Sequence, residues 1–198
     1  MKILGKNSVS QFISYIIIIA FSVSVFHLIY EIIGHLILLY KYSSGSKIFS
    51  DTFILGNDVG WTLNQWTLPM QNDLKFRINY PFTDIQMVTG IYGTSQIFYN
   101  ILGLIFITLF FFFALKCFKE ISKEQIFNKN AVKWFKRFSI LNLAFGFVGL
   151  FLFFYNNMID GYSLYFYLPL LMFGVVIFFI VEFFKKGLEL QHENDLTI

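Results

Sequence analysis

Four long apolar segments separated by polar residues dominate the pattern of the chain. These segments cover roughly residues 12–36, 95–118, 138–156 and 163–185. About 20 residues of helix, at 1.5 Å per residue, cross the roughly 30 Å hydrocarbon core of a bilayer. Each segment is close to this length or longer. The pattern therefore predicts four transmembrane helices.

A different pattern occupies the segment between the first two predicted helices. In residues 73–82 apolar and polar side chains alternate, which is typical of a strand with one buried face. We expect an antiparallel partner strand at 61–68, joined through a turn, and a third strand at 48–55. A hairpin alone is marginally stable in water, so its apolar face should pack on the helix ends or on another protein.

These elements predict an all-α membrane protein with a small extracytoplasmic β-hairpin or β-sheet between helices 1 and 2. We treat residues 1–198 as a single membrane domain, with an outer β-rich segment at 41–90. About fifty residues are too many for a plain connection, so this segment is either a lid on the helices or a ligand-sensing surface.

The distribution of basic residues predicts the orientation. Eleven of the 15 Lys and Arg residues lie before the first span, between the second and third, or after the fourth, and the outer segment holds the other four. The positive-inside rule then places both termini and the 118–137 loop in the cytoplasm. We expect a multi-pass protein of the bacterial cytoplasmic (inner) membrane.

Composition supports the membrane assignment. The chain is 57% hydrophobic and only 14% charged, far from the soluble norm. The net charge of +3 is small and its basic residues lie beside apolar runs, so anionic lipid headgroups are the expected counterpart and direct binding of nucleic acid is not expected. Cys117 is the only cysteine and cannot form an intramolecular disulfide.

The loop at 118–137 mixes aromatic and aliphatic residues with lysines. We expect it to be amphipathic and to lie at the membrane surface, with Asn128 as a possible N-cap of the helix that enters the third span. The same face could dock a cytosolic partner through Lys133, Lys136 and Arg137.

Three ionisable residues near the end of the first span, His27, Glu31 and His35, are four residues apart and share one helix face. Such a row resembles part of a metal site, but positions i and i+8 stand roughly 12 Å apart, so other ligands such as Asn156 or Asp160 would be needed. The other interpretation is a polar stripe at the membrane boundary beneath the outer segment.

Polar and small residues in the last two spans predict helix packing. Asn142 should form a hydrogen bond to another helix, and Gly146, Gly149 and Gly174 should mark points of close approach. The sequence contains no complete nucleotide, zinc-protease, serine-hydrolase or paired-cysteine motif. We therefore predict no catalytic site and no cofactor.

The chain ends in a polar segment, 186–198, of distinctive sequence. The residues from Phe184 to Gln191 and from Glu193 to Ile198, together with the stretch 125–128 before a basic helix and the four-span plan, carry a resemblance to an uncharacterised bacterial membrane protein family, domain of unknown function 2975. The family has no established activity. The resemblance implies genomic neighbourhood with small helix-turn-helix regulators, and hence a membrane partner for such a regulator.

The expected function is therefore regulatory or interactive rather than enzymatic. The inner loop and the tail residues Glu189, Glu193, Asn194 and Asp195 would bind a cytosolic partner such as a helix-turn-helix regulator. The alternative is a small transporter or metal-linked membrane enzyme that uses His27, Glu31 and His35. A purely structural subunit of a larger complex is a third possibility.

Overall fold

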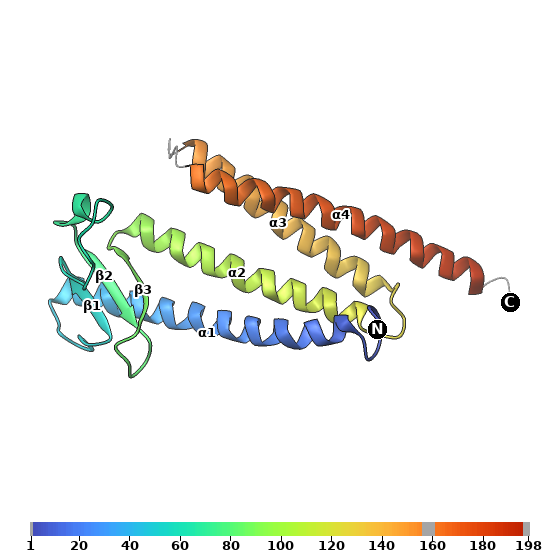
Figure 1. Cartoon of the computed structure of the whole chain (residues 1–198), viewed down its shortest axis with the longest axis horizontal. Coiled ribbons are helices and arrows are strands. Elements are labelled where there is room, and N and C mark those ends of the chain that lie inside the picture. The colour runs from blue at the N-terminus through green and yellow to red at the C-terminus, as the bar shows by residue number, and fades with distance from the viewer. Residues whose placement is uncertain (1, 156–160, 196–198) are drawn as a thin grey trace. The chain divides into compact units, whose positions relative to one another are not determined.

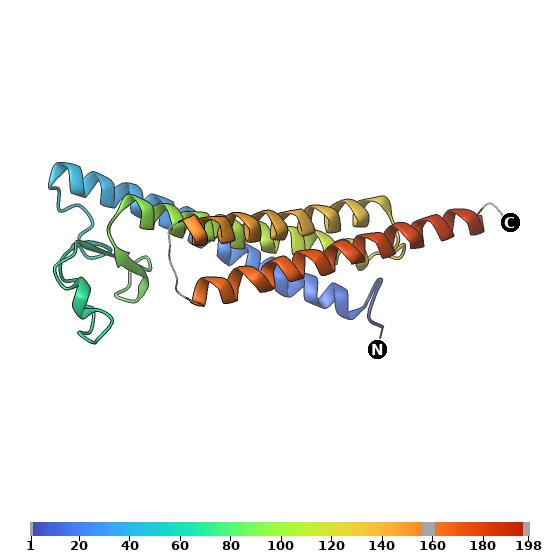
Figure 2. The same cartoon turned by 90° about the horizontal axis from the view of Figure 1, so that it is seen from above.

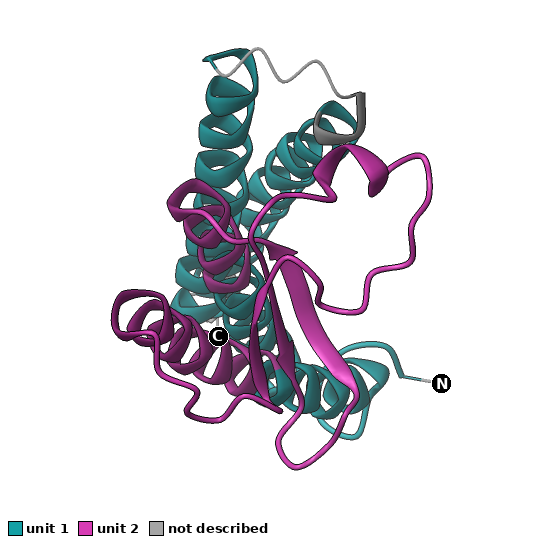
Figure 3. Cartoon of the chain, turned by 90° about the vertical axis from the view of Figure 1, so that its left-hand side faces the viewer, with its two compact units in different colours: residues 1–23, 106–198 teal, residues 24–105 magenta. Residues whose placement is uncertain are grey.

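The computed structural model describes residues 2–155 and 161–195 as four long helices and one three-stranded sheet (Figure 1). Residues 24–105 form one compact unit, and residues 1–23 with 106–198 form the other (Figure 3). The elements are α1 (Val9–Ser44), β1 (Phe53–Gly56), the 3-10 helix η1 (Leu68–Met70), β2 (Lys75–Asn79), β3 (Gln86–Ile91), α2 (Thr94–Ile121), α3 (Lys129–Tyr155) and α4 (Gly161–Asp195).

All four helices are long and apolar enough to cross a membrane, which confirms the predicted plan of four membrane helices with a small sheet between the first two. Each helix extends beyond the span expected from the apolar run, because a helix continues where its flanking polar residues reach water or headgroups. We therefore describe the chain as a multi-pass membrane protein.

The unit formed by residues 24–105 is built on an antiparallel sheet in the order β1-β2-β3. Alternation in β2 puts Phe76 and Ile78, both fully buried, against Leu38 of α1. Ile78 and Phe53 also lie over Gly34, where a methyl group would collide with the Ile78 side chain. The apolar face of the sheet thus packs on α1. The sheet needs this contact because a sheet of so few strands is only marginally stable by itself.

The predicted strand at 61–68 is wrong. Among the described residues, the partners of β2 are β1 and β3, and β3 was not expected from the sequence. Asn64 accepts hydrogen bonds from the backbone N–H groups of Trp66 and Thr67, and the Thr67 hydroxyl donates to the Thr62 carbonyl. These local side-chain bonds favour a turn over a ladder.

Three basic residues hold this unit together by donating to backbone carbonyls. The buried ammonium group of Lys75 donates to the carbonyls of Asn57, Gln71 and Asp73 at 2.8, 3.0 and 3.1 Å. Arg77 donates to the Asp84 carbonyl at 2.7 Å, and Lys41 donates to the Phe53 carbonyl. The loop on either side of η1 is therefore tied to β2 by charge-assisted hydrogen bonds.

In the other unit, α3 and α4 lie side by side over most of their length (Figures 1 and 2). Glycines allow the close approach. A Cβ on Gly146 would collide with Leu171, one on Gly149 with Tyr167, and one on Gly174 with Leu143. The predicted packing role of these three glycines is confirmed. The two helices therefore associate through close contacts at small residues. Inside a bilayer such packing drives helix association, because the hydrophobic effect does not.

The polar bond between these helices differs from the prediction. Asn142 is fully buried but donates to the Phe138 carbonyl of its own helix at 2.7 Å. Ser139, also fully buried, donates to the Gly174 carbonyl of α4 at 2.7 Å. Because α3 and α4 approach closely at Gly174, the short Ser139 side chain can reach the Gly174 carbonyl. A longer side chain could reach it without such a close approach.

We predict that Gly149→Ala lowers the stability of the protein, because the added methyl group meets the Tyr167 ring and forces α3 and α4 apart. Overpacking of this kind costs about 1–3 kcal/mol. Thermal unfolding of the purified protein in detergent measures the effect. Gly103→Ala in α2, where a Cβ meets no atom within 4 Å, is the matched control. Equal melting temperatures for the two variants would contradict the packing role.

Candidate functional site

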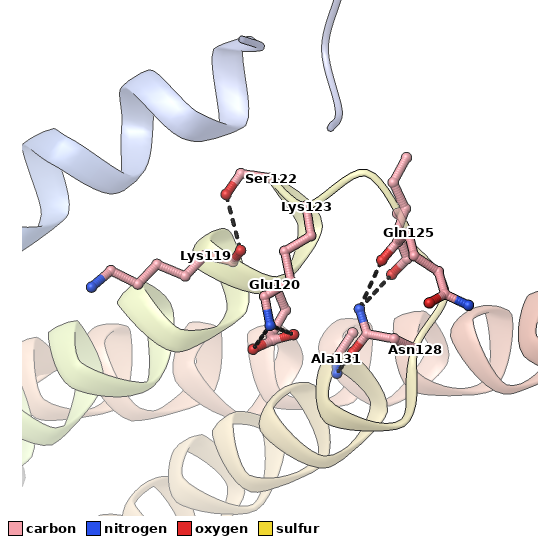
Figure 4. Close-up of polar contacts among 8 residues, drawn as sticks. Lys119, Glu120, Ser122, Lys123, Gln125, Asn128 and Ala131 are labelled. Carbon is pink, nitrogen blue, oxygen red and sulfur yellow. Dashed lines mark hydrogen bonds and ion pairs between the residues drawn. The ribbon is translucent and has the colours of Figure 1, made fainter. Parts of the chain in front are cut away.

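The α2–α3 connection is short and internally bonded. Glu120 accepts from Lys123 with both oxygens, at 2.8 and 2.7 Å, and the Asn128 side chain accepts from the Ala131 backbone N–H at 2.9 Å (Figure 4). Asn128 also donates to the Gln125 carbonyl at 2.9 Å. The predicted N-cap at Asn128 is confirmed, and its two-sided bonding fixes how the connection enters α3.

No separate interfacial helix lies within 118–137, a stretch that the structure describes completely. Residues 118–121 are the last turn of α2, and residues 129–137 are the first turns of α3. The basic amphipathic pattern of this stretch therefore belongs to the ends of two membrane helices. Long side chains at such ends cover apolar surface with their stems and extend their charges outward.

The connection packs directly on the C-terminal part of α4. The ring of Phe127 lies 5.4 Å from the ring of Phe184, and it occupies the space that a Cβ on Gly187 would need. Phe184 also stacks on Phe135 of α3 at 4.9 Å. The 125–128 stretch and the start of the polar segment are therefore in contact, although about sixty residues separate them in the sequence.

The N-terminal residues contact the end of α2 and the α2–α3 connection. The Gly5 N–H donates to the Ile121 carbonyl at 2.9 Å, where Ser10 also approaches. Lys6 lies 3.8 Å from Glu124, with both side chains largely exposed. The start of the chain therefore satisfies a carbonyl at the end of α2, which would otherwise lack a partner.

The three basic residues proposed to bind a partner differ in their surroundings. Lys133 and Arg137 lie over the Trp134 ring, at 5.9 and 5.0 Å from its centroid, and Lys116 of α2 approaches the same ring to 5.4 Å. Lys136 is exposed and makes no contact of this kind. Sequence reasoning missed Lys116, although its position beside a run of four phenylalanines was a usable signal.

The four tail residues proposed to bind a partner all belong to α4, which continues past Lys186 to Asp195. Glu189 and Glu193 are exposed, and four residues separate them, so they lie on one side of the helix. Asn194 and Asp195 end the helix. The final turns of α4 extend beyond the first residue of α3 (Figures 1 and 2).

The row in α1 faces the sheet. His27 bonds with the Tyr80 hydroxyl at 3.2 Å, and His35 packs edge-on against Phe76 with 5.0 Å between ring centroids. Glu31 and His35 are 5% and 4% exposed, and one Glu31 oxygen and both His35 nitrogens have no hydrogen-bond partner. Within residues 2–155 and 161–195, no three His, Cys, Asp or Glu side chains are placed to hold a metal ion. Asn156 and Asp160 lie outside the described residues.

A polar cavity of about 310 Å³ opens beside β2, in the segment between α1 and α2. Lys75 and Trp61 line it, with the Lys75 ammonium 5.7 Å from the Trp61 ring centroid. Asn57, Asp58, Thr67 and Gln71 supply further polar groups. Its volume is at the lower end of the range of ligand pockets, and its lining is mostly polar.

We predict that Glu31→Met preserves or raises the melting temperature, because it removes a buried carboxyl group with an unpartnered oxygen and keeps a chain of similar length. Glu182→Met, at an exposed position paired with Lys185 at 2.6 Å, is the control and should change stability by less than about 1 kcal/mol. Thermal unfolding with and without added zinc reads both out. A zinc-dependent rise that Glu31→Met abolishes would assign a metal role instead.

Comparison with curated proteins gave no match, and comparison with solved structures gave none either. Comparison with protein families gave a match to the family described as protein of unknown function (DUF2975), over residues 65–198. The match includes β2, β3 and the last three helices, together with the 125–128 stretch and the C-terminal segment that carried the resemblance. The chain belongs to this family of unknown function, DUF2975.

Proposed function

We propose that this protein is a non-enzymatic regulatory or interaction protein that presents a docking surface for a cytosolic partner such as a small helix-turn-helix regulator. The surface consists of the α2–α3 connection, the first turns of α3 and the end of α4, including Lys136, Glu189 and Glu193. In this proposal both termini face the cytoplasm of a bacterium, and the sheet lies on the outer side of the inner membrane.

One observation carries the proposal: Phe127 packs on Phe184 and Gly187. This contact joins the two distinctive polar segments of the chain, the α2–α3 connection and the polar part of α4. A helix fixed at its base presents its side chains with little loss of conformational entropy on binding, which favours a docking role.

The proposed surface has an acidic part and a basic part. Glu189 and Glu193 are acidic groups on the extended turns of α4, while Lys136 and its neighbours give the start of α3 a basic character. A small DNA-binding protein carries basic patches of its own, which complement the acidic side of α4. The acidic turns of α4 are therefore the proposed contact for the regulator.

The outer segment is proposed to supply the stimulus. The cavity lined by Trp61 and Lys75 would bind a small polar ligand, and the three carbonyl bonds of Lys75 would respond to its presence. A ligand can shift the protein between two states only by the difference of its affinities for them. The proposal therefore requires binding at this cavity to change affinity for the partner.

We predict that truncation after Gly187 abolishes co-purification with the proposed helix-turn-helix regulator, while leaving the Phe127 contact and membrane insertion intact. Glu189→Lys in the full chain should weaken binding about tenfold or more, because it reverses a charge at the contact. Affinity purification from detergent-solubilised membranes, followed by titration, measures both.

The matched control is Asp84→Lys, which reverses an exposed carboxylate of the β2–β3 loop, outside the proposed surface. It should retain binding. Unchanged regulator binding after truncation would reject the docking role of the C-terminal turns. Equal losses in Asp84→Lys and Glu189→Lys would replace the specific surface by general charge attraction.

A further inference from the structure

Three cations of the helical unit surround one indole ring. The Lys116 ammonium lies 5.4 Å from the Trp134 ring centroid, Lys133 lies at 5.9 Å and the Arg137 guanidinium at 5.0 Å. Lys116 comes from α2, and the other two come from α3. The ring attracts each cation, but the three positive charges still repel one another.

This cluster differs from three other basic residues of the same unit, each of which pairs with a carboxylate. Lys6 pairs with Glu124, Lys123 with Glu120 and Lys185 with Glu182. In the described part of the chain, no carboxylate oxygen lies within 4 Å of Lys116, Lys133 or Arg137. Three converging positive charges without a protein anion leave a place for an anion from outside.

The position of Trp134 indicates which anion. Its ring packs on Phe112 and Phe113 of α2, with centroid distances of 6.0 and 6.1 Å, at the end of an uninterrupted apolar run. The Lys116 ammonium also lies 5.4 Å from the Phe112 ring centroid, and the residue is half-buried, so this cation lies against the aromatic surface. Tryptophan at such a place marks the boundary between hydrocarbon and headgroups.

We infer that Lys116, Lys133 and Arg137 form a binding site for the phosphate of an anionic phospholipid, with Trp134 as its base. The guanidinium of Arg137 donates to two phosphate oxygens, and the ammonium groups of Lys116 and Lys133 neutralise the remaining charge. The acyl chains extend along the aromatic surface of α2. Basic clusters between membrane helices bind such headgroups by this chemistry.

The site ties α2 to α3 through the lipid, because its cations come from both helices. It uses residues other than Glu189 and Glu193, so it stands independently of the regulator-docking proposal. It also reassigns Lys133 and Arg137 from partner binding to lipid binding.

Trp134 itself supplies the test. In the full chain with Trp61→Phe and Trp66→Phe, Trp134 is the sole tryptophan. The protein is reconstituted in vesicles of phosphatidylcholine with increasing fractions of either brominated phosphatidylglycerol or brominated phosphatidylcholine, and quenching of Trp134 fluorescence gives the relative affinity. Brominated phosphatidylglycerol should quench at the lower fraction. Arg137→Gln should reduce this preference about fivefold, the contribution of one cation near a lipid surface.

The matched control removes the same charge elsewhere on the same helices. Lys119→Gln, Lys129→Gln and Lys136→Gln together should retain the preference, whereas Lys116→Gln, Lys133→Gln and Arg137→Gln together should abolish it. Equal losses in the two triple variants would overturn the site in favour of diffuse surface charge. Native mass spectrometry of the chain with all three tryptophans, counting bound phosphatidylglycerol, gives the same comparison without altering the outer segment.

Two further arms separate other occupants. Inorganic phosphate at constant ionic strength should not relieve the quenching, and relief would show a site for free phosphate rather than lipid. The Lys116, Lys133 and Arg137 triple variant should still bind the regulator. Loss of regulator binding with unchanged lipid preference would overturn the assignment and return these residues to the protein interface.

Discussion

The structure of the helical unit depends on the close approach of α3 and α4. Inside hydrocarbon two apolar helices gain little from leaving lipid for one another, so the attraction comes from dense packing and buried polar bonds. Gly146, Gly149 and Gly174 remove the side chains that would hold the backbones apart, and Ser139 then reaches the carbonyl of Gly174. The same packed stripe continues along α4 through Val181 and Phe184 to Gly187. The contact with Phe127 is thus an extension of helix packing into the polar end of the molecule.

The sheet unit uses a different solution because it has little apolar area to bury. Its core consists of Leu38, Phe53, Phe76 and Ile78, and cations take over part of the stabilisation. The Lys75 ammonium satisfies three carbonyls of a loop that has no ladder of its own. Each carbonyl left without a donor in a buried position costs about 1–3 kcal/mol. Lys41, Lys75 and Arg77 are therefore structural components of this segment rather than exposed charges.

Sequence patterns were sufficient for features governed by periodicity or by local chemistry. The four helices, the strand containing Phe76 and Ile78, the cap at Asn128 and the packing glycines follow from such patterns. The strand at 61–68 failed because Asn64 and Thr67 form turn bonds that hydrophobicity does not report. The strand β3 was missed because Thr89 and Gly90 interrupt its alternation, while its register depends on β2.

The site was less accessible to sequence reasoning, since its contacts join residues far apart in the chain. Phe127 and Gly187 belong to segments that were each recognised as distinctive, but only tertiary structure brings them together. The approach of Lys116 to Trp134 likewise depends on how α2 packs beside α3. The selection of Lys133, Lys136 and Arg137 rested on charge alone, which does not distinguish a cation over a ring from one exposed to solvent.

The uninterrupted course of α4 from its apolar turns into its acidic end has a mechanical consequence. Beyond Pro169, α4 runs on to Asp195 without another proline, so this part of the helix tilts in the bilayer as one lever. With Gly187 against Phe127 as the pivot, the remaining eight residues form an arm of roughly 12 Å. A tilt of about 10° then sweeps the tip of this arm through about 2 Å, which is comparable with the width of one hydrogen bond. A change in bilayer thickness that tilts α4 would therefore also move the acidic end of the helix.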